Sequence, residues 1–303
     1  MDKELFAHLP VAVAVAKDQG FAAAASRLGM SPSAVSHAVR AIESALGAPL
    51  FARTTRSVAL TDAGERFLAA ITPALAAIDD AAERLAADKG RVTGVLRLNA
   101  PHVSLPIAIT PVIAAMAWRY PDLTVEITQD DGLVDIVAGG FDAGVRLGEM
   151  IAEDMVAVRL TAPFKAIMVA SPSYLDAKGE PKELADLQQH NCIGYRLISS
   201  GAIYGWELLD NGRDVSVQVS GPVRVTDALL ARELALAGVG IAYLFEPLVR
   251  TDIRERKLKW LMPKASIEEP GLFLYFPRTA ANMPKLRAFI DVAREVLRPR
   301  ARA

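Results

Sequence analysis

The sequence predicts a two-part protein, an all-α N-terminal module followed by a larger α/β module. Helical patterns dominate the first 90 residues, and from about residue 92 short apolar runs alternate with helix-like segments, which is typical of an α/β fold with mostly parallel strands. Charge is also uneven, because residues 21–60 hold four arginines and one acid whereas residues 61–90 hold three bases and six acids. A chain of 303 residues is long enough for two domains of roughly 150 residues each.

The composition excludes several classes of protein. Apolar residues make up 52% of the chain and charged residues 23%, a globular balance that excludes long disorder. The single cysteine, Cys192, excludes a disulfide framework within the chain and a Cys-rich zinc site, and the four histidines lack metal-ligand spacing. We therefore expect no metal and no cofactor. The net charge of −1 gives no overall bias toward nucleic acid or membrane, so such a partner must contact a local patch.

One stretch has the length of a membrane span. Residues 98–118 contain no Lys, Arg, Asp or Glu over 21 residues, which is long enough to cross a bilayer. They also contain three prolines together with Asn99, His102 and Ser104, so a buried strand, turn and helix is the better prediction. The acidic start, Met1-Asp2-Lys3-Glu4, is unlike a signal peptide, and we expect a cytoplasmic protein with no membrane partner.

Two helices joined by a tight turn are predicted between residues 21 and 46. The first, Phe21–Leu28, is rich in alanine, and Gly29 can end it because glycine reaches the left-handed conformation without a Cβ clash. Ser31 can cap the second helix, and Pro32 suits its first position. A helix-turn-helix is therefore expected.

The second helix has two unlike faces. An apolar stripe recurs at helical spacing: Val35, Val39, Ile42 and Leu46. The other face carries short hydrogen-bonding groups and one long cation, with no acid among them: Ser33, Ser36, His37, Arg40 and Ser44. Such a face suits the major groove of DNA, which presents donors, acceptors and thymine methyl groups. The alternative is a solvated helix face, although that usually includes Glu and Lys.

Residues 49–60 predict a wing, that is, two short apolar strands around a basic, hydroxyl-rich tip. The tip contains side chains suited to DNA phosphates or the minor groove: Arg53, Thr54, Thr55 and Arg56.

A long helix is predicted after the wing, from its cap at Thr61 to about Asp88. Its apolar residues lie alternately three and four positions apart: Leu68, Ile71, Leu75, Ile78, Ala82 and Leu85. This heptad seam predicts a dimer interface between the helices of two chains, in preference to burial within one chain. Roughly 28 residues at about 1.5 Å each give a rod of about 42 Å, with a local bend expected at Pro73.

These elements resemble a known family. The winged helix-turn-helix of LysR-type transcriptional regulators is closely similar to residues 21–43 (FAAAASRLGMSPSAVSHAVRAIE), 46–47 (LG), 49–54 (PLFART) and 60–64 (LTDAG) of this chain. Ser31-Pro32-Ser33 stands in place of the commoner Ser-Gln-Pro, which indicates a Ser-Pro-Ser-Ala-Val-Ser subgroup. The resemblance covers the whole chain, because its length and its α/β remainder also match the family.

The resemblance implies a DNA-binding transcriptional regulator and not an enzyme. Such a protein binds dyad-symmetric promoter DNA as a dimer or tetramer, and a small-molecule effector modulates it. The DNA-binding residues expected on this basis are Arg27, Ser31, Ser33, Ser36, His37, Arg40, Arg53, Thr54, Thr55 and Arg56.

The resemblance also implies three regions: a DNA-binding domain at residues 1–60, a linker and dimerisation helix at 61–89, and an effector-binding domain at 90–303. The last resembles a periplasmic-type solute-binding fold (type 2) of two α/β lobes with a cleft between them. Lobe one is expected at about residues 92–161 plus 268–303, and lobe two at 162–267. The two crossovers would lie near residues 160–162 and Ile267–Glu269.

The expected cleft residues come partly from this geometry, because ligands favour the carboxyl ends of strands at such a crevice. The strand at 95–98 leads into Pro101, His102 and Ser104, where free helix N–H groups and the Ser104 hydroxyl would hold a carboxylate. Thr226 and Asp227 begin a facing helix, although Asp227 can itself occupy that helix end. The family resemblance adds Gln129, Asp130, Arg146 and Tyr243, and it implies an organic acid as a frequent kind of effector.

Several alternatives stay open at this point. A solute-binding protein for transport would share the two-lobed fold, although the wing motif argues against it. An enzyme could use Cys192 with His190 or a carboxylate pair, and Cys192 could be a redox switch, but a free cysteine is usually a small buried hydrophobe. Arg146 could pair with a structural acid instead of an effector.

Overall fold

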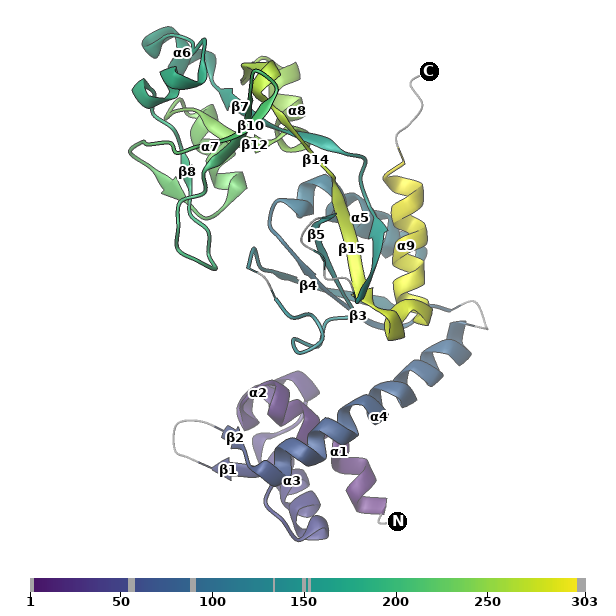
Figure 1. The fold of residues 1–303 in the computed structure, drawn as a ribbon. Helices are drawn as coiled ribbons and strands as arrows, with labels where there is room; N and C mark the ends of the chain where they lie inside the picture. Colours follow the sequence, from purple (N-terminus) through teal and green to yellow (C-terminus); the bar gives the residue numbers. More distant parts are fainter. Residues whose placement is uncertain are drawn as a thin grey trace. The chain divides into compact units, whose positions relative to one another are not determined.

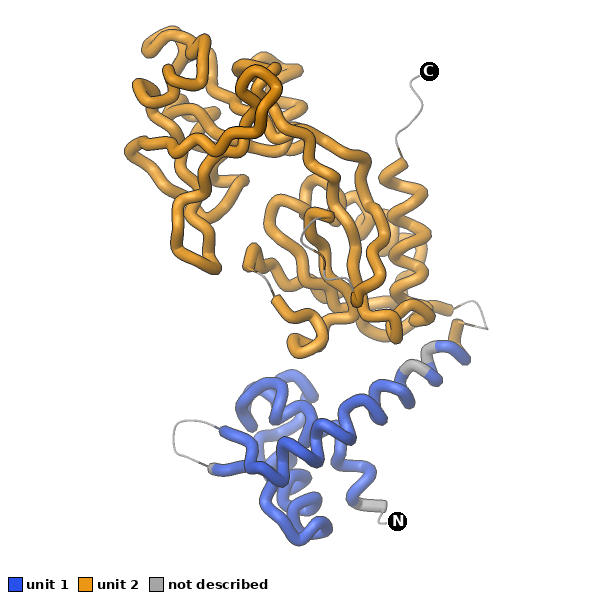
Figure 2. The backbone as a smooth tube through the Cα atoms, viewed as in Figure 1, with its two compact units in different colours: residues 1–85 blue, residues 86–303 orange. Residues whose placement is uncertain are grey.

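The computed structural model describes residues 3–53, 58–87, 91–132, 134–148, 151 and 154–298. The chain forms two compact units, residues 1–85 and residues 86–303 (Figure 2). Each unit has its own hydrophobic core. The described parts of the chain contain no helix with the length and apolar character needed to span a bilayer.

The first unit consists of a helical bundle, a two-stranded wing and a long helix (Figure 1). Its elements are α1 (Lys3–Lys17), α2 (Phe21–Leu28), α3 (Pro32–Leu46), β1 (Phe51–Arg53), β2 (Val58–Leu60) and α4 (Asp62–Ala87). The predicted stripe of α3 is confirmed as core, because Val35, Val39 and Ile42 are fully buried against α1 and α2. Strands β1 and β2 pair antiparallel, with Phe51 opposite Leu60.

Local signals in the sequence set the ends of these helices. Gly29 ends α2 with a φ of 63°, in the left-handed region that glycine favours. The Ser31 hydroxyl accepts a hydrogen bond from the Ala34 amide at 3.2 Å, which caps α3. The Thr61 hydroxyl accepts from the Gly64 amide at 3.0 Å and donates to the Pro49 carbonyl at 2.7 Å, so it caps α4 and fixes it to the start of the wing.

Gly64 allows α4 to approach the backbone of the wing. A Cβ atom at this position would lie 2.1 Å from the Leu50 carbonyl oxygen. We therefore expect Gly64→Ala to destabilise the first unit by about 1–3 kcal/mol, because backbone must move to make room. Hydrogen exchange of the α3 and α4 amides in the full chain measures this loss. Gly20→Ala is the control, since its nearest non-neighbouring atom would lie 3.7 Å away, and equal exchange in both variants would contradict the steric explanation.

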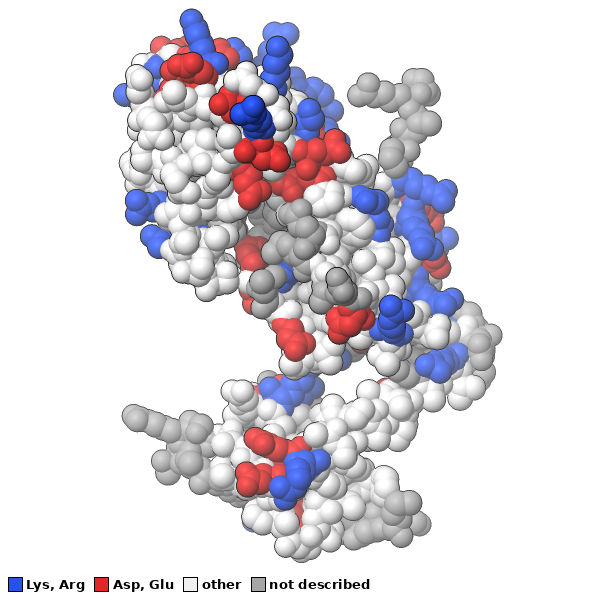
Figure 3. All heavy atoms as spheres, in the orientation of Figure 1, with Lys and Arg blue, Asp and Glu red and all other residues white. Residues whose placement is uncertain are grey.

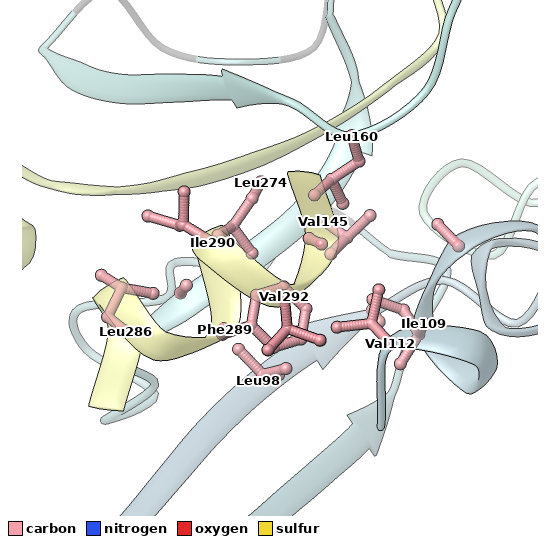
Figure 4. Close-up of a cluster of buried hydrophobic side chains, with 14 of the residues drawn as sticks. Leu98, Ile109, Val112, Val145, Leu160, Leu274, Leu286, Phe289, Ile290 and Val292 are labelled. Atoms are coloured by element: carbon pink, nitrogen blue, oxygen red, sulfur yellow. The ribbon is translucent and has the colours of Figure 1, made fainter. Parts of the chain in front are cut away.

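The described residues of the second unit form two main sheets and two further pairs of strands, and the larger main sheet has the strand order β4-β3-β5-β15-β6. Its strands are β3 (Gly94–Ala100), β4 (Leu123–Gln129), β5 (Ala143–Leu147), β6 (Met155–Arg159) and β15 (Leu272–Pro277). The helical segments of this part, which we call lobe one, are η1 (Leu105–Ile109), α5 (Thr110–Arg119), η5 (Arg278–Asn282) and α9 (Pro284–Val296). The core lies between the sheet and these helices, where Leu98 and Val145 meet Val112 of α5 and Phe289 of α9 (Figure 4).

The smaller sheet is built around β7 (Phe164–Ala170), and we call this part lobe two. β7 pairs with β12 (Ala242–Phe245), β13 (Lys259–Leu261) and β14 (Ile267–Glu269). Around it lie α6 (Pro172–Lys178), η3 (Leu184–Gln189), β8 (Gly194–Tyr195), β9 (Trp206–Asp210), β10 (Arg213–Val217), β11 (Arg224–Val225), α7 (Ala228–Leu236), α8 (Glu246–Arg254) and η4 (Pro263–Ala265). Alternate residues of β7 serve two cores, with Ile167 and Val169 against α7 and α8, and Met168 against the β9 side.

The expectation of mostly parallel strands is wrong. β3 runs parallel to β4 and β5, but β15 is antiparallel to both of its neighbours, and every partner of β7 is antiparallel to it. The reason lies in the chain crossings, since β6 leads from lobe one to β7 whereas β15 brings the chain back from β14, so these two paired strands run in opposite directions. The turn Asp210-Asn211-Gly212 joins β9 and β10 in a hairpin, with Asn211 and Gly212 both at positive φ.

The two chain crossings between the lobes lie side by side. The Leu160 amide donates to the Leu272 carbonyl at 2.8 Å, and the Leu272 amide donates to the Thr161 hydroxyl at 2.9 Å. Gly271, at a φ of 92°, has no room for a side chain, because a Cβ would lie 2.8 Å from the Ala162 carbonyl oxygen. Glu269 still belongs to the sheet of lobe two, slightly beyond the boundary expected at residue 267.

Candidate nucleic-acid interface and ligand pocket

The polar face of α3 is accessible to solvent. Ser33, His37 and Arg40 are exposed, and Ser36 is half-buried. The Ser31 hydroxyl lies 3.0 Å from the Ser33 hydroxyl in addition to capping the helix, so both oxygens already have a partner at the helix start. Arg40 Nε donates to the Ser36 carbonyl of its own helix at 3.3 Å, which leaves the terminal amino groups of its guanidinium on the exposed side.

Glu43, the single acid among residues 21–60, does not face solvent with these groups. Its carboxylate accepts hydrogen bonds from the Leu50 amide at 2.9 Å and the Phe51 amide at 3.2 Å. The acid therefore joins α3 to the first strand of the wing. Its negative charge is used within the fold, which leaves the exposed face of α3 free of carboxylates.

The structure describes some of the other residues that are expected to contact DNA. Arg27 forms an ion pair with Asp18 at 2.7 Å, which joins α2 to the turn after α1. Arg53 is the last residue of β1. Thr54, Thr55 and Arg56, the expected tip of the wing, lie outside the described residues.

The predicted seam on α4 divides into two parts. Leu68 is only 5% exposed and packs into the core of its own unit, which differs from the expectation that it faces a second chain. The reason is that the first turns of α4 also cover the helical bundle. Farther along, Ile71 and Leu75 are half-buried, whereas Ile78 and Leu85 are 62% and 67% exposed.

A pocket of about 350 Å³ lies between the lobes of the second unit. Lobe one contributes Pro101, Val103, Asp131 and Arg146, and lobe two contributes aromatic side chains and Glu207. Glu269 and Leu272, on either side of a chain crossing, complete its wall. Its size and its position between two lobes are those of a site for a small molecule.

Three of the expected effector contacts line this pocket: Pro101, Arg146 and Tyr243. Six do not: His102, Ser104, Gln129, Asp130, Thr226 and Asp227. Gln129 and Thr226 are exposed elsewhere. The carboxylate of Asp130 accepts from the Gly132 amide at 2.7 Å, and Asp227 caps α7 by accepting from the Leu230 amide at 2.9 Å. The possibility that Asp227 occupies its own helix end is thus confirmed.

The expected anion site at the start of the helix after β3 is also filled by the chain itself. The Ser104 hydroxyl is buried and donates to the Pro101 carbonyl at 2.7 Å. The His102 amide donates to the Asp131 carboxylate at 2.8 Å, and His102 Nδ1 lies 3.2 Å from the other oxygen of that carboxylate. These groups therefore hold the loop together through contacts within the chain.

Arg146 supplies a positive charge in the pocket wall. Only 3% of the residue is exposed, and it donates to the carbonyls of Val145 at 2.8 Å and Gly132 at 2.5 Å and to Asn99 Oδ1 at 3.0 Å. All three acceptors are neutral. Within the described ranges no ion pair involves Arg146, so these residues give no support to pairing with a structural acid.

Comparison with known proteins identifies both units. The bacterial regulatory helix-turn-helix of the lysR family matches residues 6–65, and the LysR substrate binding domain matches residues 89–298. The chain belongs to the LysR family of transcriptional regulators. It is a DNA-binding regulator with an effector-binding domain, and the enzyme and transport alternatives are therefore wrong.

This LysR-family regulator has relatives that match it over more than nine-tenths of both chains. HTH-type transcriptional regulator PgrR of Escherichia coli is 35% identical over 291 residues, covering 96% of this chain and 97% of PgrR. The E. coli regulator YcaN is 36% identical over 278 residues, covering 92% of this chain and 91% of YcaN. The solved structure of CrgA, a LysR-type transcriptional regulator from Neisseria meningitidis, is similar with a TM-score of 0.62 at 28% identity, covering 96% of this chain and 98% of that chain.

The pocket of the LysR-family regulator contains aromatic residues that the sequence reasoning missed: Tyr195, Tyr204 and Trp206. The rings of Trp206 and Tyr243 stack with centroids 5.6 Å apart, and the Tyr243 hydroxyl donates to the Glu207 carbonyl at 2.5 Å. Burial raises the pKa of Tyr195 to about 12, and the nearby carboxylates of Asp131 and Asp227 act in the same direction. A signal existed in the sequence, because three aromatic residues fall within positions 195–206 of a chain that is only 6% aromatic.

Cys192 of the regulator lies in the core of lobe two. It is buried beside Leu187, whose carbonyl accepts from its thiol at 3.7 Å, and burial raises the pKa of the thiol to about 12. His190 Nδ1 instead lies 3.1 Å from the Tyr174 hydroxyl. A buried, protonated thiol is a poor nucleophile, so these contacts support the interpretation as a small apolar side chain. Groups of His, Cys, Asp or Glu suited to a metal are absent from the described parts of the chain.

Proposed function

We propose that this LysR-family regulator binds dyad-symmetric promoter DNA as a dimer in the cytoplasm, and that an organic acid in the interlobe pocket modulates its binding. The observation that carries the DNA-binding part is the exposed, acid-free face of α3. Ser33, Ser36, His37 and Arg40 would read bases in the major groove, with Arg27, Ser31 and the wing residues Arg53 to Arg56 nearer the phosphates.

Pairing through α4 would place two recognition helices on one dyad-symmetric site. The support is the exposed half of the seam, where Ile78 and Leu85 present large apolar side chains to solvent. Single exposed apolar side chains are ordinary on a protein surface. Two large ones seven residues apart on the same long helix favour a partner helix. Two such dimers would form a tetramer.

The effector part of the proposal is supported by the pocket. It joins residues from both lobes, so an occupant would contact both and change the equilibrium between open and closed arrangements. Arg146 offers a positive group for an acidic effector. A change in lobe closure would then alter how the paired DNA-binding units bend the promoter.

A gel shift across a salt series tests the DNA-binding function. The DNA upstream of the regulator's own gene, with its divergent neighbour, is compared with unrelated DNA of equal length. We expect preferential binding of the upstream DNA that persists at physiological salt. Equal binding of both DNAs that disappears as salt rises would show only the phosphate contribution and would contradict a specific site there.

A further inference from the structure

We infer that the interlobe pocket takes a zwitterion, a small ligand that carries one carboxylate and one protonated amine on an apolar or aromatic body, as an amino acid does. This inference rests on the proposed function of the pocket as the effector site. It goes further by assigning opposite charges of the ligand to different parts of the wall.

The carboxylate belongs at Arg146. This guanidinium is nearly fully buried, yet its three hydrogen bonds go to neutral oxygens. Asn99, whose Oδ1 accepts from Arg146, is completely buried, and its Nδ2 has no hydrogen-bond partner among the described residues. A buried charge is costly unless an opposite charge compensates it, and an unpaired amide donor adds to that cost. A ligand carboxylate beside Arg146 would supply the missing negative charge.

The protonated amine of the ligand is inferred from the other charged residues that line the pocket. Among the described residues that line the pocket, Asp131, Glu207 and Glu269 are acidic and Arg146 is the one base. Figure 3 shows acidic side chains gathered over β14, the strand that contains Glu268 and Glu269. A ligand with only a carboxylate would therefore enter a pocket in which carboxylates outnumber cations. A protonated amine on the same ligand offsets this repulsion and makes the ligand neutral overall.

The body of the ligand lies against aromatic side chains. The stacked rings of Trp206 and Tyr243 give lobe two a flat apolar surface, and Pro101 and Val103 face the pocket from lobe one. Aromatic faces also attract a protonated amine, so the same surface can serve both the body and the cation. A volume of about 350 Å³ accommodates a ligand the size of a single-ring amino acid.

Calorimetric titration of the full chain with two matched sets of probes tests the inference. The aromatic set is phenylalanine, 3-phenylpropionate and phenethylamine, and the aliphatic set is leucine, 4-methylpentanoate and isopentylamine. We expect the zwitterion of at least one set to bind about tenfold or more tighter than both single-charge analogues, because each analogue lacks one of the two charges that the pocket wall attracts. Tighter binding of an acid alone, or of an amine alone, overturns the inference. So does the absence of binding by all six at millimolar concentration.

Two variants locate the carboxylate. Asn99→Asp keeps the shape of the side chain but puts a carboxylate beside Arg146, so the site is filled from within and the zwitterion should lose about tenfold or more in affinity. Arg146→Met should abolish the advantage of the zwitterion over the amine. Arg213→Met, at an exposed position of β10, is the matched control and should change neither. Unchanged zwitterion binding in folded Asn99→Asp protein overturns the assignment.

This test is separable from the test of the proposed function. Specific promoter binding by the gel shift, together with a preference for an acid alone, would overturn the zwitterion and leave the regulator. A preference for the zwitterion without specific promoter binding would support the ligand class. It would contradict a specific site in the DNA upstream of the regulator's own gene.

Discussion

Ile78→Glu should convert the proposed dimer into a monomer and weaken promoter binding by about 100-fold or more. Ile78 is 62% exposed on α4 and lies in the half of the seam that does not pack on its own unit. In a paired coiled coil the substitution would bury one carboxylate from each helix in an apolar seam, which a helix interface does not tolerate. The loss of affinity follows because two linked recognition helices bind about 100- to 10,000-fold tighter than one.

Light scattering coupled to size exclusion measures the mass, and a gel shift on the same sample measures DNA affinity. Ala76→Glu is the matched control, since it adds the same charge at an exposed position of α4 outside the seam. Leu68 is unsuitable for this experiment, because it is buried in the first unit and its replacement would disturb folding. A dimeric Ile78→Glu protein with full DNA affinity would refute the seam as the interface.

Arg40→Ala should weaken binding to the specific site by about 1–3 kcal/mol, or roughly 5- to 150-fold, and leave binding to unrelated DNA nearly unchanged. The reason is the place of Arg40 in the middle of the exposed polar face of α3, where its bond to the Ser36 carbonyl holds the side chain along the helix. Arginine in the major groove donates to two acceptors of guanine at once, and alanine cannot replace that contact.

Competition gel shifts with specific and unrelated DNA separate this role from phosphate binding. If Arg40 contacts only a phosphate, affinity should fall by the same factor on both DNAs and the salt dependence should become shallower. Arg84→Ala, on the exposed surface near the end of α4, serves as the control for loss of one positive charge.

Much of the fold could be predicted because its signals are local. Gly29, Ser31 and Thr61 act within a few residues of their own positions, and each ends or starts a helix as expected. The parallel arrangement was wrong because strand direction depends on how a connection crosses from one lobe to the other, as between β14 and β15. No local pattern contains that information.

The pocket was predicted less completely for a related reason. Arg146 and Tyr243 were found through family motifs, whereas Ser104 and Asp227 were expected in the pocket because residues of their type bind ligands at helix starts. Both side chains instead form hydrogen bonds with nearby backbone groups, and only the three-dimensional structure shows these bonds. Asp131, Trp206 and Glu269 come from distant parts of the chain, so their meeting is a property of the tertiary fold.

The paired crossings at Thr161 and Gly271 have a mechanical consequence. Because Leu272 is bonded to both Leu160 and Thr161, one crossing cannot slide along the other without breaking these bonds. The chain thus passes between the lobes through two hydrogen-bonded segments, and a pair of this kind resists shear more than bending. We therefore expect an occupant that draws the lobes together to change mainly the angle between them, about one short axis at the two crossings.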